Sequence, residues 1–148
     1  MLRLASAKAN AVSRENPDAL VIGSDQLASC RGEAFGKPGS REKAFEQLQA
    51  IRGQQLDFHT GLCLLNSRTE ARQLDCVSYS IEFRDYSNDE IERYLDREQP
   101  YNCAAAFKSE ALGISLVSSM SGPDPTALIG LPLISLCRML RQEGLVLP

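Results

Sequence analysis

The residues best suited to chemistry are an aspartate and a lysine about a dozen positions apart. Asp25 follows the apolar run Leu20–Ile22, which has the length and β-branched content of a buried strand and is interrupted by Gly23. Lys37 lies in a Gly-Lys-Pro turn. Ligands gather just past the carboxyl ends of strands in α/β sheets. The pair is therefore typical of a site that holds phosphate and activates water, although a turn-capping aspartate and a solvated lysine fit the same spacing.

Two other segments carry candidate binding residues. Lys8 falls on the edge of the apolar face of a predicted helix, where it is either a lysine that snorkels to solvent or a phosphate ligand facing the same cleft as Asp25. In Cys103–Glu110, small residues precede Lys108 and Glu110. These charges are either an exposed ion pair that adds little to stability or polar groups at the rim of a site that recognise a ligand.

The elements that must position these residues alternate between helix and strand signals. Helices are predicted over Leu2–Arg14, from the N-cap Ser40 to Gly53, after the capping box Ser87–Glu90, and from Leu131-Pro132 onwards. Strands are predicted over Leu20–Ile22, Phe58–Leu65, Cys76–Phe83 and Ile114–Val117, while Leu27–Cys30 either extends the first or begins a hairpin. We expect a single α/β domain over residues 1–148, with a mixed twisted sheet, flanking helices and two lobes around a cleft.

Composition excludes several classes of protein. The chain has 148 residues, of which 43% are hydrophobic and 24% charged, as in ordinary globular proteins. A net charge of −3 argues against a nucleic-acid surface, which needs a basic patch. No apolar run approaches the ~20 residues that span a bilayer, and the start lacks the apolar core of a signal peptide. We therefore expect a cytoplasmic protein with neither nucleic-acid nor membrane partners.

The cysteines do not indicate a metal or a disulfide framework. All five stand singly, without a Cys-x-x-Cys pair. A catalytic cysteine would need the single histidine, His59, which falls in a predicted strand. Reduced thiols that fill apolar space are the favoured interpretation, and a zinc site has no support.

Five short blocks together resemble a known family. They are Gly23-Ser24-Asp25-Gln26, Gly36-Lys37-Pro38, Thr60-Gly61, Phe107–Gly113 and Gly130-Leu131-Pro132. In order and spacing they are similar to the Maf-like nucleoside triphosphate pyrophosphatases, and the resemblance covers essentially the whole chain. The Gly-Ser-Asp-Gln form resembles the branch that acts on 7-methyl-GTP, whereas the branch acting on dTTP and UTP typically has Gly-Ala-Asp-Thr.

The resemblance implies a two-lobed Maf/ITPase-like fold and hydrolysis between the α and β phosphates of a nucleotide, with a divalent metal such as Mg²⁺ or Mn²⁺. It makes Asp25 the proton acceptor. The carboxylate could instead hold the metal that acidifies the attacking water, and both roles stay open. Further residues that match family positions are the catalytic Lys37 and the substrate-binding residues Lys8, Gln26, Lys108 and Glu110. Gln26 and Glu110 would take part in base choice.

The charges of such a substrate fit these residues. A nucleoside triphosphate brings about four negative charges, for which two lysines and a metal ion are suitable counter-charges. A carboxylate at Glu110 can accept hydrogen bonds from the N1–H/N2–H edge of guanine. It would also favour a base that carries a positive charge after N7-methylation.

The sequence departs from the family pattern at its beginning. The family opens with a strand and a Ser-x-Ser-Pro-x-Arg-Arg loop, whereas this sequence starts at the equivalent of the next helix. Without that loop, two phosphate contacts of ~1.5–3 kcal/mol each would be lost. Without the strand, exposed sheet edge or apolar surface would favour a homodimer or aggregation. Two hypotheses follow: a working 7-methyl-GTP pyrophosphatase, or an inactive truncated relative that binds nucleotide or a protein partner without turnover.

Overall fold

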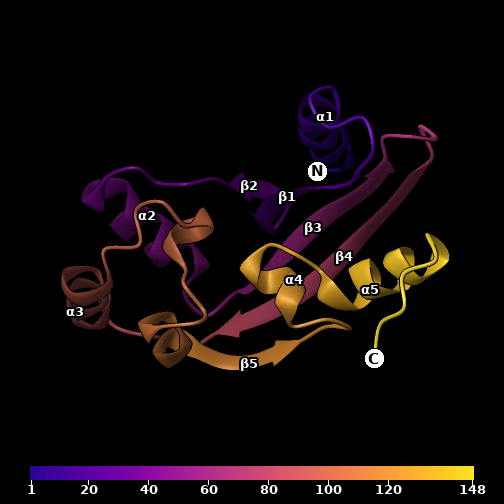
Figure 1. Ribbon diagram of the computed structural model, residues 1–148. Helices are drawn as coiled ribbons and strands as arrows, with labels where there is room; N and C mark the ends of the chain where they lie inside the picture. The colour runs from indigo at the N-terminus through magenta and orange to yellow at the C-terminus, as the bar shows by residue number, and fades with distance from the viewer. The chain divides into compact units, whose positions relative to one another are not determined.

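The computed structural model describes residues 1–148 and has an α/β architecture (Figure 1). Five strands form one sheet in the order β2-β1-β3-β4-β5. Their bounds are β1 Leu20–Cys30, β2 Glu33–Phe35, β3 Gln55–Asn66, β4 Arg72–Phe83 and β5 Val117–Ser121. The registers of β1 with β2 and of β4 with β5 are antiparallel. The α/β class is thus confirmed, with an antiparallel sheet in place of the mixed one expected.

The helices are short, and the predicted ones are present. They are α1 Leu2–Ser13, α2 Arg41–Ile51, α3 Asn88–Glu98, α4 Thr126–Ile129 and α5 Leu133–Gln142, with 3-10 helices η1 Ala104–Ala106 and η2 Leu112–Leu116. Two have the predicted N-caps: Ser40 accepts from the Lys43 amide, and Ser87 forms a complete capping box with Glu90. None of these helices has the length and apolar character needed to cross a membrane.

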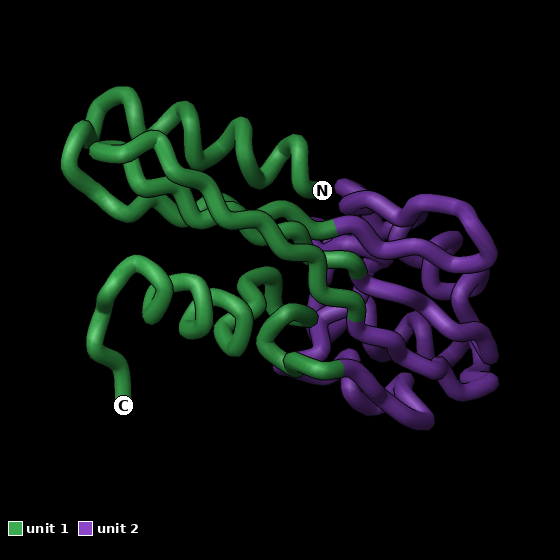
Figure 2. The backbone as a smooth tube through the Cα atoms, turned by 90° about the vertical axis from the view of Figure 1, so that its right-hand side faces the viewer, with its two compact units in different colours: residues 1–26, 59–78, 123–148 green, residues 27–58, 79–122 purple.

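The chain divides into two compact units, coloured in Figure 2. Unit 1 consists of residues 1–26, 59–78 and 123–148, and unit 2 of residues 27–58 and 79–122. Helices α1, α4 and α5 belong to unit 1, whereas α2 and α3 belong to unit 2.

In unit 1, both faces of β3 are covered by helices. Cys63 and Leu65 pack with Ala5 and Ala9 of α1, whereas the alternate residues Leu62 and Leu64 pack with Leu136 and Met139 of α5. Figure 2 shows α1 and α5 on opposite sides of the strands. Successive side chains of a strand point to opposite faces, so a strand buried on both faces needs an unbroken apolar run. This explains why residues 61–65 read as continuous apolar sequence.

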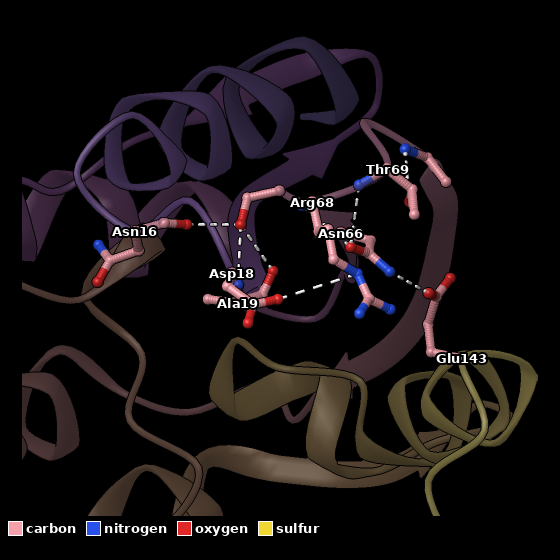
Figure 3. A network of polar contacts seen from close by, with 9 residues as sticks. Asn16, Asp18, Ala19, Asn66, Arg68, Thr69 and Glu143 are labelled. Atoms are coloured by element: carbon pink, nitrogen blue, oxygen red, sulfur yellow. Dashed lines mark hydrogen bonds and ion pairs between the residues drawn. The ribbon is translucent and has the colours of Figure 1, made fainter.

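A polar network ties the turn between β3 and β4 to the chain that leads from α1 into β1 (Figure 3). The Ser67 hydroxyl donates to the carbonyl of Asn16 and accepts from the Ala19 amide at 2.9 Å. The side-chain amide of Asn66 donates to Glu143 at 2.8 Å. The Ser67 bonds fix the residues that enter β1 and therefore the start of the strand that carries Asp25, whereas the Asn66 bond joins the end of β3 to the residue that follows α5.

Unit 2 has a core of aromatic rings and buried helix faces. Phe107 packs against Phe83 with ring centroids 5.1 Å apart and against Phe58 at 6.1 Å. The fully buried Tyr86 donates its hydroxyl hydrogen to the Leu48 carbonyl of α2 at 2.7 Å. Burial raises the pKa of the Tyr86 hydroxyl, so this donor stays protonated. The contacts of Phe107 with Phe83 and Phe58 anchor the start of the Phe107–Gly113 block in this core.

The prediction that the first strand breaks at Gly23 is wrong. β1 continues through Gly23 and Asp25 to Cys30, and turns into β2 at Arg31 and Gly32, both with positive φ. A Cβ at Gly23 would lie 2.1 Å from the Ala5 carbonyl oxygen of α1. Gly23 is therefore the point where helix and strand backbones approach each other, and Asp25 lies within the strand instead of beyond its end.

Two further expectations need correction, and one helix was not expected. The strand predicted over Ile114–Val117 is wrong, because residues 112–116 form η2 and the strand runs over Val117–Ser121. Helix α4 has no sequence prediction. Leu4, Val12 and Ile134 are 48%, 52% and 61% exposed, so α1 and α5 bury narrower apolar stripes than their sequences indicate.

Candidate active site

The polar side chains of residues 24–26 in β1 point to opposite faces of the sheet. Ser24 and Gln26 point the same way in the strand, and Asp25 points the opposite way, toward α1. There the Lys8 ammonium donates to Asp25 Oδ1 at 2.8 Å and to the Ser24 carbonyl at 2.9 Å. The Asp25 side chain is 20% exposed and that of Lys8 57%. The structure thus brings together two of the six candidate site residues, from segments 17 positions apart.

This arrangement can perform acid–base chemistry beside a bound anion. The ion pair uses a single oxygen of Asp25, and the carboxylate remains reachable from solvent. An ammonium has three donors, of which two are engaged here. Lys8 therefore keeps one donor for a phosphate oxygen, while its charge lies next to a potential proton acceptor.

Gln26 is held inside unit 1 by its side-chain nitrogen. Nε2 lies 2.8 Å from the Ala127 carbonyl, 3.1 Å from the Leu128 carbonyl and 3.0 Å from Thr60 Oγ1. The buried Thr60 hydroxyl donates to the same Ala127 carbonyl at 2.8 Å. The amide nitrogen therefore fastens β1 to α4, and this contact supports the turn that follows α4.

Ser24 makes the second link to that turn. Its hydroxyl oxygen lies 2.7 Å from the Gly130 carbonyl and 3.0 Å from the Gly61 carbonyl. Three of the five blocks noted in the sequence, at residues 23–26, 60–61 and 130–132, thus meet within unit 1. Hydrogen bonds of the Ser24 and Gln26 side chains join these blocks.

A neighbouring aspartate that sequence reasoning missed organises the same turn. Asp124 is 2% exposed and accepts hydrogen bonds from the Thr126 amide at 2.9 Å and the Ile134 amide at 2.8 Å. It thereby satisfies free amides at the starts of α4 and α5. The turn residues Gly122–Pro125 were its only signal in the sequence.

In unit 2, Lys37 lies on a loop with a fixed backbone. The Gly36 carbonyl accepts from the Ala105 amide at 3.1 Å, and the Gly39 amide donates to the Tyr101 carbonyl at 2.9 Å. Ala105 is fully buried with φ +56°, a left-handed conformation that costs about 1–2 kcal/mol in a residue with a Cβ. The loop is therefore held at both ends, and the exposed Lys37 side chain extends from it.

Lys108 is braced by a carboxylate that the sequence analysis missed. Its ammonium lies 2.7 Å from Glu98 Oε1, and the other oxygen of Glu98 accepts from the Leu112 amide at 3.2 Å. The hydrogen bond from Lys108 holds the pKa of the Glu98 carboxyl below its ordinary value, and the same contact raises the pKa of Lys108. An acidic residue at the C-terminus of a helix opposes the helix dipole, and this was the available signal.

Glu110 and Cys103 differ in what they can contribute. The Glu110 carboxylate is exposed and accepts a hydrogen bond from the Ser109 hydroxyl at 3.3 Å, so it can meet a ligand. Burial, followed by the charge of Glu110, raises the pKa of the Cys103 thiol. Cys103 is therefore held in its unreactive protonated form, as expected for a packing residue.

A divalent cation bound at Asp25 would have this carboxylate as its protein ligand. The structure holds no group of three or more His, Cys, Asp or Glu side chains that could bind a metal ion. Mg²⁺ in phosphate-transferring enzymes is commonly held by one or two carboxylates together with substrate phosphates and water. The lone, partly exposed carboxylate of Asp25 fits that pattern, and it does not fit a closed structural site.

Comparisons with known proteins show the family of this chain. The family model described as "Maf-like protein" matches residues 1–143. The chain is 56% identical over 146 residues to the 7-methyl-GTP pyrophosphatase of Aromatoleum aromaticum, covering 99% of this chain and 75% of that protein. It is 50% identical over 143 residues to the 7-methyl-GTP pyrophosphatase of Methylobacillus flagellatus, covering 97% and 74% respectively.

The chain belongs to the Maf-like protein family. A third relative, the 7-methyl-GTP pyrophosphatase of Alcanivorax borkumensis, is 48% identical over all 148 residues of this chain, which cover 75% of that protein. The family resemblance noted from the five sequence blocks is thereby confirmed.

Proposed function

We propose that this protein hydrolyses 7-methyl-GTP to 7-methyl-GMP and pyrophosphate. The observation that carries the proposal is the Lys8–Asp25 pair, which places a reachable carboxylate beside a cation on the strand that bears the Gly-Ser-Asp-Gln block. Relatives at 48–56% identity carry that activity in their names. Removal of the modified nucleotide would keep it from entering nucleotide metabolism.

The reaction would break the bond between the α-phosphorus and the oxygen that bridges to the β-phosphate. Water attacks the α-phosphorus and gives its proton to Asp25, and pyrophosphate leaves with the bridging oxygen. Lys8 would hold the carboxylate in place and offer its third donor to a phosphate oxygen. Catalysis of phosphoryl transfer rests mainly on such positioning and charge stabilisation.

A divalent cation, Mg²⁺ or Mn²⁺, would bind at Asp25 together with the substrate phosphates. When bound, it would neutralise the charge of the triphosphate. Asp25 would thus serve as metal ligand, as proton acceptor, or as both.

We assign roles toward the phosphates and the base to Lys37, Lys108 and Glu110 from the family resemblance. Lys37 extends from a fixed loop and would stabilise charge on the reacting phosphates. Glu110 would accept hydrogen bonds from the guanine edge and favour its cationic, N7-methylated form. Lys108, aligned by Glu98, would bind substrate, and Gln26 would influence base choice by holding α4.

The proposal is tested by measuring pyrophosphate release from 7-methyl-GTP, GTP, dTTP and UTP with Mg²⁺. We expect 7-methyl-GTP to have the highest kcat/KM and the Asp25→Asn variant to lose turnover. Preference for dTTP or UTP would overturn the substrate assignment. Binding of 7-methyl-GTP without pyrophosphate release would instead support a nucleotide-binding relative that lacks activity.

We further propose a homodimer that works in the cytoplasm. The five free cysteines suit a reducing compartment, and Leu4 and Val12 leave apolar surface exposed on α1. Sedimentation velocity of the wild type and of a Leu4→Ser/Val12→Ser variant tests the dimer. A monomer at micromolar concentration would contradict it.

A further inference from the structure

Helix α3 and the 3-10 helix η2 line an open pocket of about 270 Å³ in unit 2. Its polar lining is dominated by Arg84, Arg93 and Arg97, with Glu90 as the only acidic residue. Three positive charges and one negative charge leave a net charge of +2 on the lining. The chain as a whole has a formal net charge of −3, so the lining of this pocket is positive although the protein is acidic.

Arg84 is anchored at this pocket. Its guanidinium donates to Glu90 at 2.9 Å and to the Ser115 carbonyl at 2.7 Å, so it joins the start of α3 to η2. The hydrogen bond from Arg84 lowers the pKa of the Glu90 carboxyl to about 2, which keeps the pair ionised. The arginine is consequently held in one orientation before any ligand arrives.

Arg93 and Arg97 are exposed and have no ion-pair partner. They stand four residues apart on α3, so their side chains share one face and repel each other. The neighbouring carboxylates of the same helix, Glu92 and Asp96, pair with Arg41 instead. Two like charges without an ion-pair partner at the rim of a cavity favour the binding of an anion.

The geometry points to a binding site for a phosphate-bearing anion of charge −2 or more, held by Arg93 and Arg97 with Arg84 at its side. Guanidinium groups match phosphate oxygens through paired N–H donors, and exposed phosphate sites weaken with salt. The pocket volume suits inorganic phosphate, pyrophosphate or the phosphate end of a monoester. This site uses none of the residues assigned above to hydrolysis and does not depend on that activity.

The site is adjacent to the segment that carries Lys108 and Glu110. Leu112 and Ser115 line the pocket, and the Leu112 amide bonds to Glu98, which also holds Lys108. Bound anion should therefore be detectable at backbone amides of η2 as well as at α3. This gives the experiment a positional readout.

Titration of ¹⁵N-labelled protein followed by amide chemical shifts tests the site, with inorganic pyrophosphate, inorganic phosphate and GMP as separate probes. We expect saturable shifts at residues 93, 97 and 112–116 for at least one probe. The strongest probe distinguishes a free phosphate from a monoester. We expect Arg93→Ala/Arg97→Ala to weaken that binding by about tenfold or more, and 300 mM NaCl to weaken it in the wild type.

Both substituted positions are exposed, and alanine favours helix, so the variant should fold, which circular dichroism verifies. Arg68→Ala, at an exposed arginine in the turn between β3 and β4, should leave the titration unchanged. Shifts that stay away from α3 and η2, or that persist undiminished in the double variant, would overturn the proposal. Shifts confined to residues 8 and 25 would mark pyrophosphate at the hydrolytic residues and would equally count against this site.

Discussion

Lys8 Nζ lies 2.8 Å from Asp25 Oδ1 and simultaneously 2.9 Å from the Ser24 carbonyl oxygen. One helix side chain thus contacts both the backbone and the carboxylate of the strand next to it. Gly23 makes the contact possible, since any side chain there would collide with the Ala5 carbonyl. The proposed proton acceptor is therefore oriented by α1.

Asp25→Asn should abolish most turnover and leave the fold intact. Loss of a proton acceptor typically costs about 10²–10⁴-fold in rate. Both partners of the ion pair are partly exposed, so the free energy of unfolding should change by less than about 1 kcal/mol. Pyrophosphate release and thermal melting measure the two effects, and wild-type turnover in the variant would remove Asp25 from the mechanism.

Lys37→Ala should lower kcat strongly while the melting temperature barely moves. The Lys37 side chain is exposed, and the loop is fixed by backbone bonds that this change leaves in place. Lys43→Ala, at an exposed lysine of α2, is the matched control and should retain full activity. Unfolding of the Lys37 variant would show that the residue is structural.

Gln26→Leu should destabilise unit 1. The change removes the donor that serves Thr60 and the carbonyls of Ala127 and Leu128, and unsatisfied polar groups of this kind cost about 1–3 kcal/mol. Chemical denaturation measures the loss, and Gln55→Ala at the exposed start of β3 is the control. A stable variant with altered base preference would indicate that Gln26 instead reads the base directly.

Glu98→Gln should disturb base preference through Lys108. The charged partner of Lys108 is lost while the shape of the side chain remains, so the ammonium gains freedom. We expect KM for 7-methyl-GTP to rise more than kcat falls, and Glu110→Gln to reduce the preference over GTP. Equal kinetics in wild type and Glu98→Gln would exclude this positioning role.

Glu90 should make stability depend on pH in the acid range. Its pKa is about 2 in the folded protein against an ordinary value of 4.5, because Arg84 and the Ser87 amide bond to the carboxylate. The contribution is complete above about pH 4.5 and is lost as the pH falls toward about 2. The free energy of unfolding, measured by urea denaturation at a series of pH values in that range, should depend less on pH for Glu90→Gln than for wild type. Glu46→Gln should show the same dependence on pH as wild type.

Much of the fold could be predicted from contiguous residues. The capping box at Ser87–Glu90 and the helix from Ser40 to Gly53 depend on contacts within a few positions, and the hairpin of β3 and β4 follows from strand composition. Predictions were wrong where contacts between segments far apart in the sequence determine the local structure. The local pattern at Gly23 indicates a strand end, because the neighbouring residues in the sequence do not include Ala5, which the Gly23 backbone approaches in the fold.

By itself, the sequence determined the class of fold, the family and the residue types at the candidate site, because periodicity, caps and motif order are local properties of the chain. Only the tertiary structure decided what each polar group contacts. Gln26 meets Ala127, and Glu98 meets Lys108, through packing that no spacing along the chain encodes. Hydrogen bonds need partners within about 3 Å, and that proximity is created by the fold.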